Sequence, residues 1–235
     1  MRIVNDNELN ERKSDIREPK FKVFAMFEGN KTEVLYFSAL FRKERFSNIE
    51  YLYFKKEDNE VGWSNPRKLV DYICNLLNNS KNEVLGIELL NFDDGLSFRF
   101  STYDCNIDKI ALIVDRDKES FTENQYDYVI VECEKHNIDF IVTNPCFEFY
   151  LLLHLSNCKE LALDNLDNET VMKYLVQKDK NYKKERYNVE KYVSLYETAV
   201  KNAKYYKTDI DSIKNNIGTN IGEWINKILE LAKNE

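Results

Sequence analysis

One stretch of the sequence decides the fold, Lys109-Ile110-Ala111-Leu112-Ile113-Val114-Asp115-Arg116-Asp117. Its five consecutive apolar residues predict a strand that is buried on both faces, as in a parallel sheet. Residues i and i+2 of an extended chain point to the same side, so Asp115 and Asp117 would project together from the end of this strand. A divalent cation such as Mg²⁺ would offset their mutual repulsion. An ordinary turn after a core strand would explain the same two Asp residues.

Four strands alternate with helices along the first two thirds of the chain. This order predicts an α/β fold, a parallel sheet of about four strands flanked by helices. An insertion over residues 83–107, with an Asp93-Asp94-Gly95 turn, resembles a β-hairpin. We expect a flexible arm over residues 1–19, a core over 20–156 and a helical extension over 157–235. The predicted strands cover residues 21–27, 49–54, 109–117 and 138–142.

Composition excludes several classes of protein. The 235 residues are 43% hydrophobic, enough for one large domain or one core with an appendage. No apolar run approaches the ~20 residues of a membrane helix, and residues 1–20 are too polar for a signal peptide. The five cysteines form no Cys-x-x-Cys pair and there are only two histidines. We therefore expect a cytoplasmic protein with reduced thiols, without a zinc framework, disulfides or a His-rich metal site.

Acidic residues follow two of the predicted strands. Glu28 precedes Gly29 at the end of the first strand, and Asp115 and Asp117 end the third. In open α/β sheets, sites lie outside the carboxyl ends of the strands, so these carboxylates should share one end of the sheet. Glu33 would lie in the first turn of the next helix, capped by Asn30 or Thr32, where the helix dipole alone could explain an acid.

The segment 144–155 predicts a buried helix, with Asn144 as its cap and Pro145 in its first turn. Glu148 is the only acidic residue of this apolar helix. A buried carboxylate is costly unless it is paired or bound to metal. Glu148 would therefore join the other acids, or else form a salt bridge with a Lys or Arg. His154 is interpreted as a core histidine.

Basic and aromatic residues are concentrated in residues 173–207. This window has a net charge of +6, against −13 for the rest of the chain, and contains seven of the fifteen tyrosines. Such a mixture suits nucleic acid, because cations meet phosphates and rings stack on bases. A solvated helical face with tyrosines packed on the body would have the same composition. Within a basic loop, Lys183, Lys184 and Arg186 could hold a phosphate backbone.

Three blocks, residues 27–33, 114–117 and 144–154, together resemble the RloB-like family, which has a Toprim-type core. The similarity covers about residues 20–206. The family's later Asn-Pro-x-Thr pattern has no Pro here, where the chain reads Asn216-Ile217-Gly218-Thr219.

The resemblance implies a nuclease that depends on Mg²⁺ (or Mn²⁺) and cleaves DNA or RNA such as tRNA. It implies metal binding by Asp115 and Asp117, and proton transfer or metal binding by Glu28. It further implies an ABC-like ATPase partner of the overcoming-lysogenisation (OLD) type and a role in abortive infection against phage. The alternative is a non-catalytic Toprim-like binding or regulatory subunit of an ATPase complex. The expected metal ligands are Glu28, Glu33, Asp115, Asp117 and Glu148, and the expected phosphate-binding residues are Arg116, Lys183, Lys184 and Arg186.

Overall fold

The computed structural model describes residues 19–29, 31–56, 65–78, 87–90, 97–98, 103–159, 166–184 and 186–234. Within these residues, seven strands form one sheet in the order β4-β3-β2-β1-β5-β6-β7. The neighbours β2, β1, β5 and β6 are parallel, which confirms the predicted four-stranded parallel core. The strands are β1 (Phe21–Phe27), β2 (Ile49–Lys56), β3 (Ile87–Leu90), β4 (Ser97–Phe98), β5 (Lys109–Asp115), β6 (Ile138–Asn144) and β7 (Gly218–Thr219).

The strands β3 and β4 pair antiparallel with each other, and β3 pairs antiparallel with β2. The expected hairpin therefore extends the sheet beyond β2. Its predicted turn at residues 93–95, like the predicted N-terminal arm over residues 1–18, lies outside the described residues.

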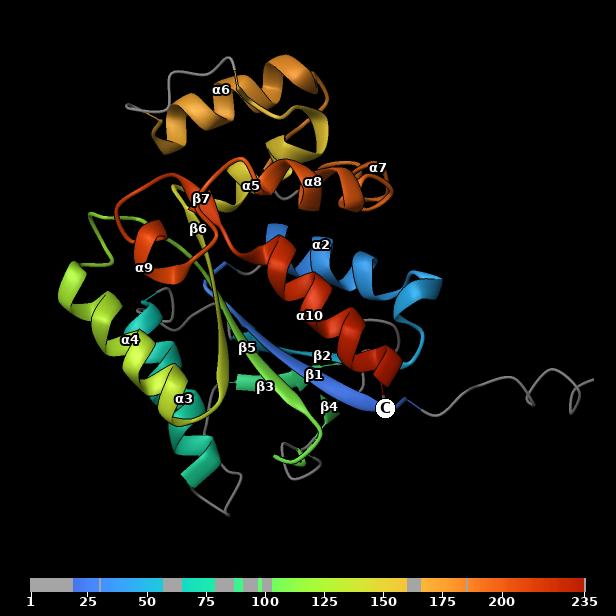
Figure 1. The fold of residues 1–235 in the computed structure, drawn as a ribbon, viewed down its shortest axis with the longest axis vertical. Helices are drawn as coiled ribbons and strands as arrows, with labels where there is room; N and C mark the ends of the chain where they lie inside the picture. Colours follow the sequence, from blue (N-terminus) through green and yellow to red (C-terminus); the bar gives the residue numbers. More distant parts are fainter. Residues whose placement is uncertain are drawn as a thin grey trace, which may run out of the picture.

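Helices cover both faces of the sheet, with α3 and α4 on one side and α2 and α10 on the other (Figure 1). The helices α5 to α8 lie together beyond the carboxyl ends of the parallel strands. None of the helices in the described part of the chain combines the length and apolar character that a membrane span needs. The helices are α2 (Thr32–Phe41), α3 (Pro66–Asn78), α4 (Glu123–Lys135), α5 (Phe147–Leu155), α6 (Asn168–Lys178), α7 (Val189–Val193), α8 (Tyr196–Ala203), α9 (Ile210–Ile213) and α10 (Ile221–Asn234), with a 3₁₀ turn η1 (Glu44–Phe46).

Alternate residues of each central strand enter two separate hydrophobic cores. From β5, Ala111 and Ile113 pack with α2, α5 and α10, whereas Leu112 and Val114 pack with α3 and α4. This is the period-2 pattern of a strand covered on both faces. Asp115 continues the alternation toward the face that α2 and α10 cover.

Several predicted boundaries were wrong. The strand β5 ends at Asp115, not at Asp117. Asn144 does not cap α5, since it belongs to β6 and its amide donates to the carbonyl of Ile213 (2.8 Å). The helix α5 instead begins after Cys146, and α2 begins after Lys31, without the expected side-chain cap from Thr32.

The outer side of β6 is covered by the C-terminal segment. The strand β7 pairs antiparallel with the last two residues of β6. Asn220 continues this pairing with its side chain, because its amide oxygen accepts from the Val142 N–H and its amide nitrogen donates to the Phe140 carbonyl, both at 2.8 Å. Backbone groups of β6 are thus satisfied by one buried side chain.

Candidate active site

Four acidic residues from four elements form what we call the acidic cluster: Glu28, Glu33, Asp115 and Glu148. Glu28 follows β1, Glu33 lies in the first turn of α2, Asp115 ends β5, and Glu148 lies in the first turn of α5. Burial raises the pKa of Asp115 well above its usual value, and the carboxylates of Glu33, Glu28 and Glu148 raise it further. Three of the four acids that we expected beside Asp115 therefore lie close enough to repel it, and the fourth, Asp117, is described below.

Two hydrogen bonds with the backbone of β5 hold Glu28 in place. The Glu28 N–H donates to the carbonyl of Ile113 (3.0 Å), and the Asp115 N–H donates to Oε2 of Glu28 (3.0 Å). The first bond extends the β1–β5 pairing by one residue. The second holds the Glu28 carboxylate at the last residue of the neighbouring strand, where a site in this fold class is expected.

Glu33 reaches the site because Gly29 has no side chain. A Cβ at position 29 would lie 2.4 Å from Oε2 of Glu33 and 2.7 Å from its Cδ. The carboxylate thus occupies the space that any other residue at position 29 would need. After β1, Glu28 therefore supplies one acid of the cluster, and Gly29 leaves the space that a second acid, Glu33, occupies.

Glu148 is 3% exposed, and two residues of the predicted basic loop contact it. The Tyr182 hydroxyl donates to Oε1 of Glu148 at 3.4 Å, and Nζ of Lys184 lies 3.6 Å from the same oxygen. The predicted alternative, a salt bridge to a lysine, is therefore present. It does not replace the cluster, because Lys184 also interacts with Glu33 and Asp115.

Lys184 is the cation of the acidic cluster. Burial lowers its pKa, but the carboxylates of Glu148, Glu33 and Asp115 have the larger combined effect and raise it. Conversely, the ammonium of Lys184 opposes the rise of the Asp115 pKa without cancelling it. Three acids near one ammonium leave an excess of negative charge, and the side chain of Lys184 is 65% exposed.

The sequence analysis missed Cys146, the residue before α5. Its thiol is buried, and burial followed by the charges of Asp115 and Glu148 raises its pKa well above the usual value. Cys146 is therefore a protonated neighbour of the acidic cluster. Its position two residues before Glu148 could have suggested this.

Asp117 and Arg116 lie beyond the end of β5. The carboxylate of Asp117 accepts from the Glu119 N–H (3.0 Å) and from the Ser120 hydroxyl (2.9 Å), as the turn interpretation predicts. Arg116 is 2% exposed and donates to the carbonyls of Phe121 and Lys214. These buried contacts do not support the expected role of Arg116 in phosphate binding, since its guanidinium already holds two backbone segments together.

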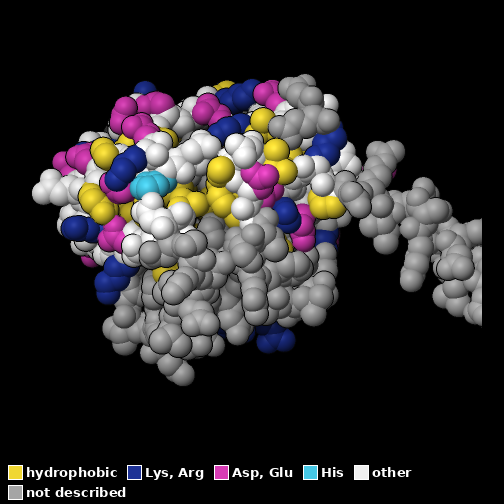
Figure 2. Space-filling view, turned by 90° about the horizontal axis from the view of Figure 1, so that it is seen from below, with side chains coloured by type: hydrophobic (Ala, Val, Ile, Leu, Met, Phe, Trp, Pro, Cys, Tyr) yellow, Lys and Arg dark blue, Asp and Glu magenta, His cyan; other side chains and the backbone are white. Residues whose placement is uncertain are grey.

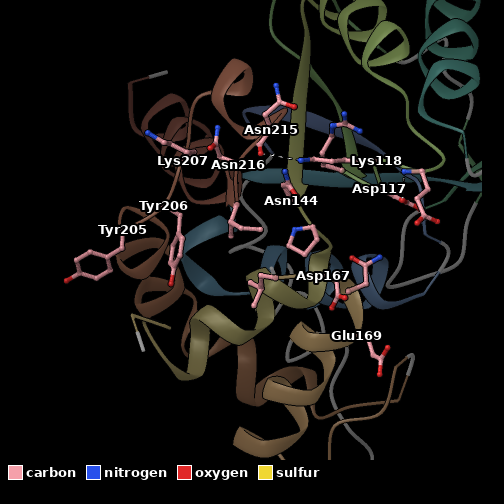
Figure 3. A pocket seen from close by; sticks show the side chains of 16 residues that line it. Asp117, Lys118, Asn144, Asp167, Glu169, Tyr205, Tyr206, Lys207, Asn215 and Asn216 are labelled. Carbon is pink, nitrogen blue, oxygen red and sulfur yellow. Dashed lines mark hydrogen bonds between the residues drawn. The ribbon is translucent and has the colours of Figure 1, made fainter. Parts of the chain in front are cut away.

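A pocket of about 1050 Å³ opens beside Asp117 (Figure 3). Its walls come from the turn after β5, the end of β6, the start of α6 and the loops that follow α8 and α9. Lys118 and Lys207 line it, and Nζ of Lys118 donates to the Asn215 carbonyl at 3.3 Å. Tyr205, which also lines the pocket, is 50% exposed and lies under Nζ of Lys159, 3.9 Å from the ring centre.

Most tyrosines of the basic window pack on the body of the protein. Tyr182 and Tyr192 are buried, and Tyr187 donates to the carbonyl of Thr32 at 2.9 Å. Of the candidate phosphate-binding residues, Lys183, Lys184 and Arg186 are exposed. The aromatic part of the pattern is thus largely structural. Figure 2 shows the opposite end of the molecule, where Lys and Arg side chains are interspersed with Asp and Glu.

His154 is a core histidine, as predicted. It is buried between the Tyr36 hydroxyl, 2.8 Å from Nε2, and the Tyr150 carbonyl, 2.9 Å from Nδ1. Burial lowers its pKa to about 4, so it is neutral near pH 7. The five cysteines are all free.

The fold and the acidic cluster define an α/β protein with a carboxylate site at the carboxyl ends of β1 and β5. The family model described as RloB-like protein matches residues 23–228, so the chain belongs to the RloB-like family. No curated protein and no solved structure matches the chain.

Proposed function

We propose that this protein is a metal-dependent phosphodiesterase of the Toprim type that cleaves nucleic acid, DNA or RNA. The observation that carries the proposal is the convergence of the acidic cluster at the carboxyl ends of β1 and β5, where the Asp115 N–H donates to the Glu28 carboxylate. The other three carboxylates raise the pKa of Asp115, which agrees with this placement. Like charges gathered from four elements are costly, and a hard divalent cation relieves that cost. A donor set made only of carboxylate oxygens fits Mg²⁺ or Mn²⁺.

Glu28, Asp115 and Glu148 would hold the cation, with Glu33 beside them and Asp117 as a further candidate at the start of the turn. When bound, the cation would polarise a phosphodiester and lower the pKa of a bound water. Without it the carboxylates repel one another, so we expect them to stand further apart than in the loaded protein. Glu28, oriented by the Asp115 N–H, is placed to accept a proton from the attacking water.

The charge on the substrate would be met by the basic loop. The exposed ammonium of Lys184 lies next to Glu148, where it can stabilise negative charge on a phosphate. Lys183 and Arg186 are exposed on the same loop and could follow the backbone away from the site. The half-exposed Tyr205 lines the pocket beside Asp117, and the ring face opposite Lys159 would be the surface on which a base stacks.

The test is cleavage of labelled DNA and RNA, including tRNA, by the purified chain with Mg²⁺ or Mn²⁺. We expect cleavage that a chelator abolishes and that Asp115→Asn removes. Glu230→Gln is the matched control, because it removes one exposed carboxylate on α10, far along the chain from the cluster. Cleavage that persists in the chelator, or in Asp115→Asn, would contradict the proposal.

The contact between Lys184 and Glu148 favours one alternative. A protein that carries its own cation in the acidic cluster could be a non-catalytic subunit whose site is already partly neutralised. The resemblance to RloB-like proteins suggests an ABC-like ATPase of the OLD type as partner in both cases, within abortive infection against phage. Binding to such an ATPase without cleavage, with or without ATP, would support the subunit. Cleavage triggered in the complex would support the nuclease.

A further inference from the structure

A second cluster of side chains lies where α3 packs against α4, on the other face of the sheet from α5 (Figure 1). It consists of Cys74 from α3, Glu132 from α4 and His136, which ends α4. His136 is two residues before β6 begins, so this cluster belongs to the amino end of that strand. The acidic cluster, in contrast, lies at the carboxyl ends of β1 and β5.

The three side chains point at a common centre. Sγ of Cys74 lies 3.9 Å from Oε2 of Glu132, and Nε2 of His136 lies 3.5 Å from the same oxygen. One ligand atom from each residue lies within 4.8 Å of the other two. Within the described residues, this is the one set of three or more His, Cys, Asp or Glu side chains that meets this limit.

These separations are near those of a tetrahedral zinc site. Bond lengths of ~2.0–2.3 Å to nitrogen, oxygen and sulfur place neighbouring ligand atoms about 3.3–3.6 Å apart. The separation between His136 and Glu132 falls in this range, and the one between Cys74 and Glu132 exceeds it by about 0.3 Å. The ligand atoms of Cys74 and His136 lie within 4.8 Å of each other. Side-chain rotations that bring Cys74 closer to Glu132 and His136 would close the set around an ion.

The donor set also differs in chemistry from the acidic cluster. Sulfur, nitrogen and oxygen from Cys, His and Glu suit Zn²⁺, whereas oxygen alone suits Mg²⁺. The side chains of Glu132 and His136 are 18% and 15% exposed, so the centre is sheltered but open to solvent at one side. Glu132 and His136 are also four residues apart on a helix, which places both on one face.

We propose that Cys74, Glu132 and His136 bind a Zn²⁺ ion, with water as the fourth ligand. The Cys74 thiol gives its proton to solvent as the sulfur–zinc bond forms. In the free protein, burial and the charge of Glu132 raise the pKa of this thiol to about 11, so the thiol is protonated until a cation arrives. Lys135, which lies 3.5 Å from Glu132, would lose this partner on zinc binding.

The experiment uses Co²⁺ as a spectroscopic substitute for Zn²⁺ in the full chain. We expect a thiolate-to-cobalt charge-transfer band at one Co²⁺ per chain, which Zn²⁺ abolishes by displacement. Cys74→Ser should remove the band, and His136→Gln should weaken Zn²⁺ binding at least about tenfold in competition with a chelating dye. Zn²⁺ should also raise the thermal unfolding midpoint of the wild type but not of Cys74→Ser.

Two other thiols serve as controls. Cys146 lies beside the acidic cluster, which could itself take up Co²⁺. Cys133 lies on α4 and is close to Cys74 of α3. Cys146→Ser and Cys133→Ser should keep the band. A band that is absent from the wild type, or that disappears with Cys146 rather than Cys74, would overturn the proposal. Circular dichroism of metal-free Cys74→Ser would distinguish a lost ligand from a lost fold.

Discussion

Asp115 and Asp117 are two residues apart but lie in two different environments. Asp115 ends β5 inside a group of acids that raise its pKa, whereas Asp117 accepts two hydrogen bonds within the turn that follows. The rule that residues i and i+2 share a side holds only while the chain stays extended, and here the strand ends between them. Asp115 is therefore held among like charges that repel it, whereas Asp117 is stabilised by hydrogen bonds within its own turn.

The largest expected difference between the two acids is in activity. We expect Asp115→Asn to lower Mg²⁺-dependent cleavage by about 10²-fold or more, the scale seen when a group that stabilises developing charge is removed. Asp117→Asn should lower it by about tenfold or less, as an indirect effect. Initial rates on the same labelled substrate measure both. Equal losses would mean that Asp117 leaves its turn and joins the cation, and the comparison would then fail.

Gly29→Ala tests whether Glu33 belongs with Asp115. The new methyl group would overlap the Glu33 carboxylate and so push it out of the acidic cluster. We expect Mg²⁺ to bind about tenfold more weakly, the scale of a disturbed neighbour of a metal ligand. Calorimetric titration measures the affinity, and Gly222→Ala on α10 is a control for an added methyl group. Unchanged Mg²⁺ affinity would exclude Glu33 from the site.

The pH dependence of stability should separate the two acids next. A raised pKa means that the folded protein holds the Asp115 proton more tightly than the unfolded chain does. The free energy of unfolding should therefore fall as pH rises from 3.8, the usual value, to the raised value in the folded protein. Asp115→Asn should flatten this fall and be more stable than the wild type at neutral pH. Urea unfolding in the presence of a chelator, at several pH values, measures the free energy of unfolding of both proteins. If it changed with pH in the same way for the wild type and for Asp115→Asn, the repulsion at Asp115 would be contradicted.

Asp117→Ala should have the opposite sign and the smallest effect. It removes the acceptor for the Glu119 N–H and the Ser120 hydroxyl. Each of these two hydrogen bonds contributes about 0.5–1.5 kcal/mol to stability, and less in an exposed turn. We expect the free energy of unfolding to fall by about 1 kcal/mol, measured by urea unfolding at neutral pH. A rise would place Asp117 among the repelling acids instead.

The layers of the fold could be predicted because a strand that is buried on both faces is a continuous apolar run, as in the residues before Asp115. The end of β5 could not be predicted, because it depends on partners far along the chain. Arg116 donates its N–H to the Thr143 carbonyl (2.7 Å) and its guanidinium to the Lys214 carbonyl, 98 residues away. No local pattern reports such contacts.

The candidate sites show the same limit. Glu28, Asp115 and Glu148 could be brought together from sequence, because strand ends in a parallel sheet share one side. The cluster at α3 and α4 could not be predicted, because the sequence has neither close cysteine pairs nor several histidines. Glu132 and His136 have helical spacing, but Cys74 is 58 residues from Glu132 and meets it only through helix packing.

The Asn220 side chain that pairs with β6 also bears on how far the chain can be shortened. Its amide and β7 occupy backbone groups that a strand from another molecule would otherwise seek. A version cut before Gly218 would expose this row of donors and acceptors beside a hydrophobic face. Such a product would be prone to edge-to-edge self-association, so β7 and Asn220 protect the chain from aggregation as well as completing the sheet.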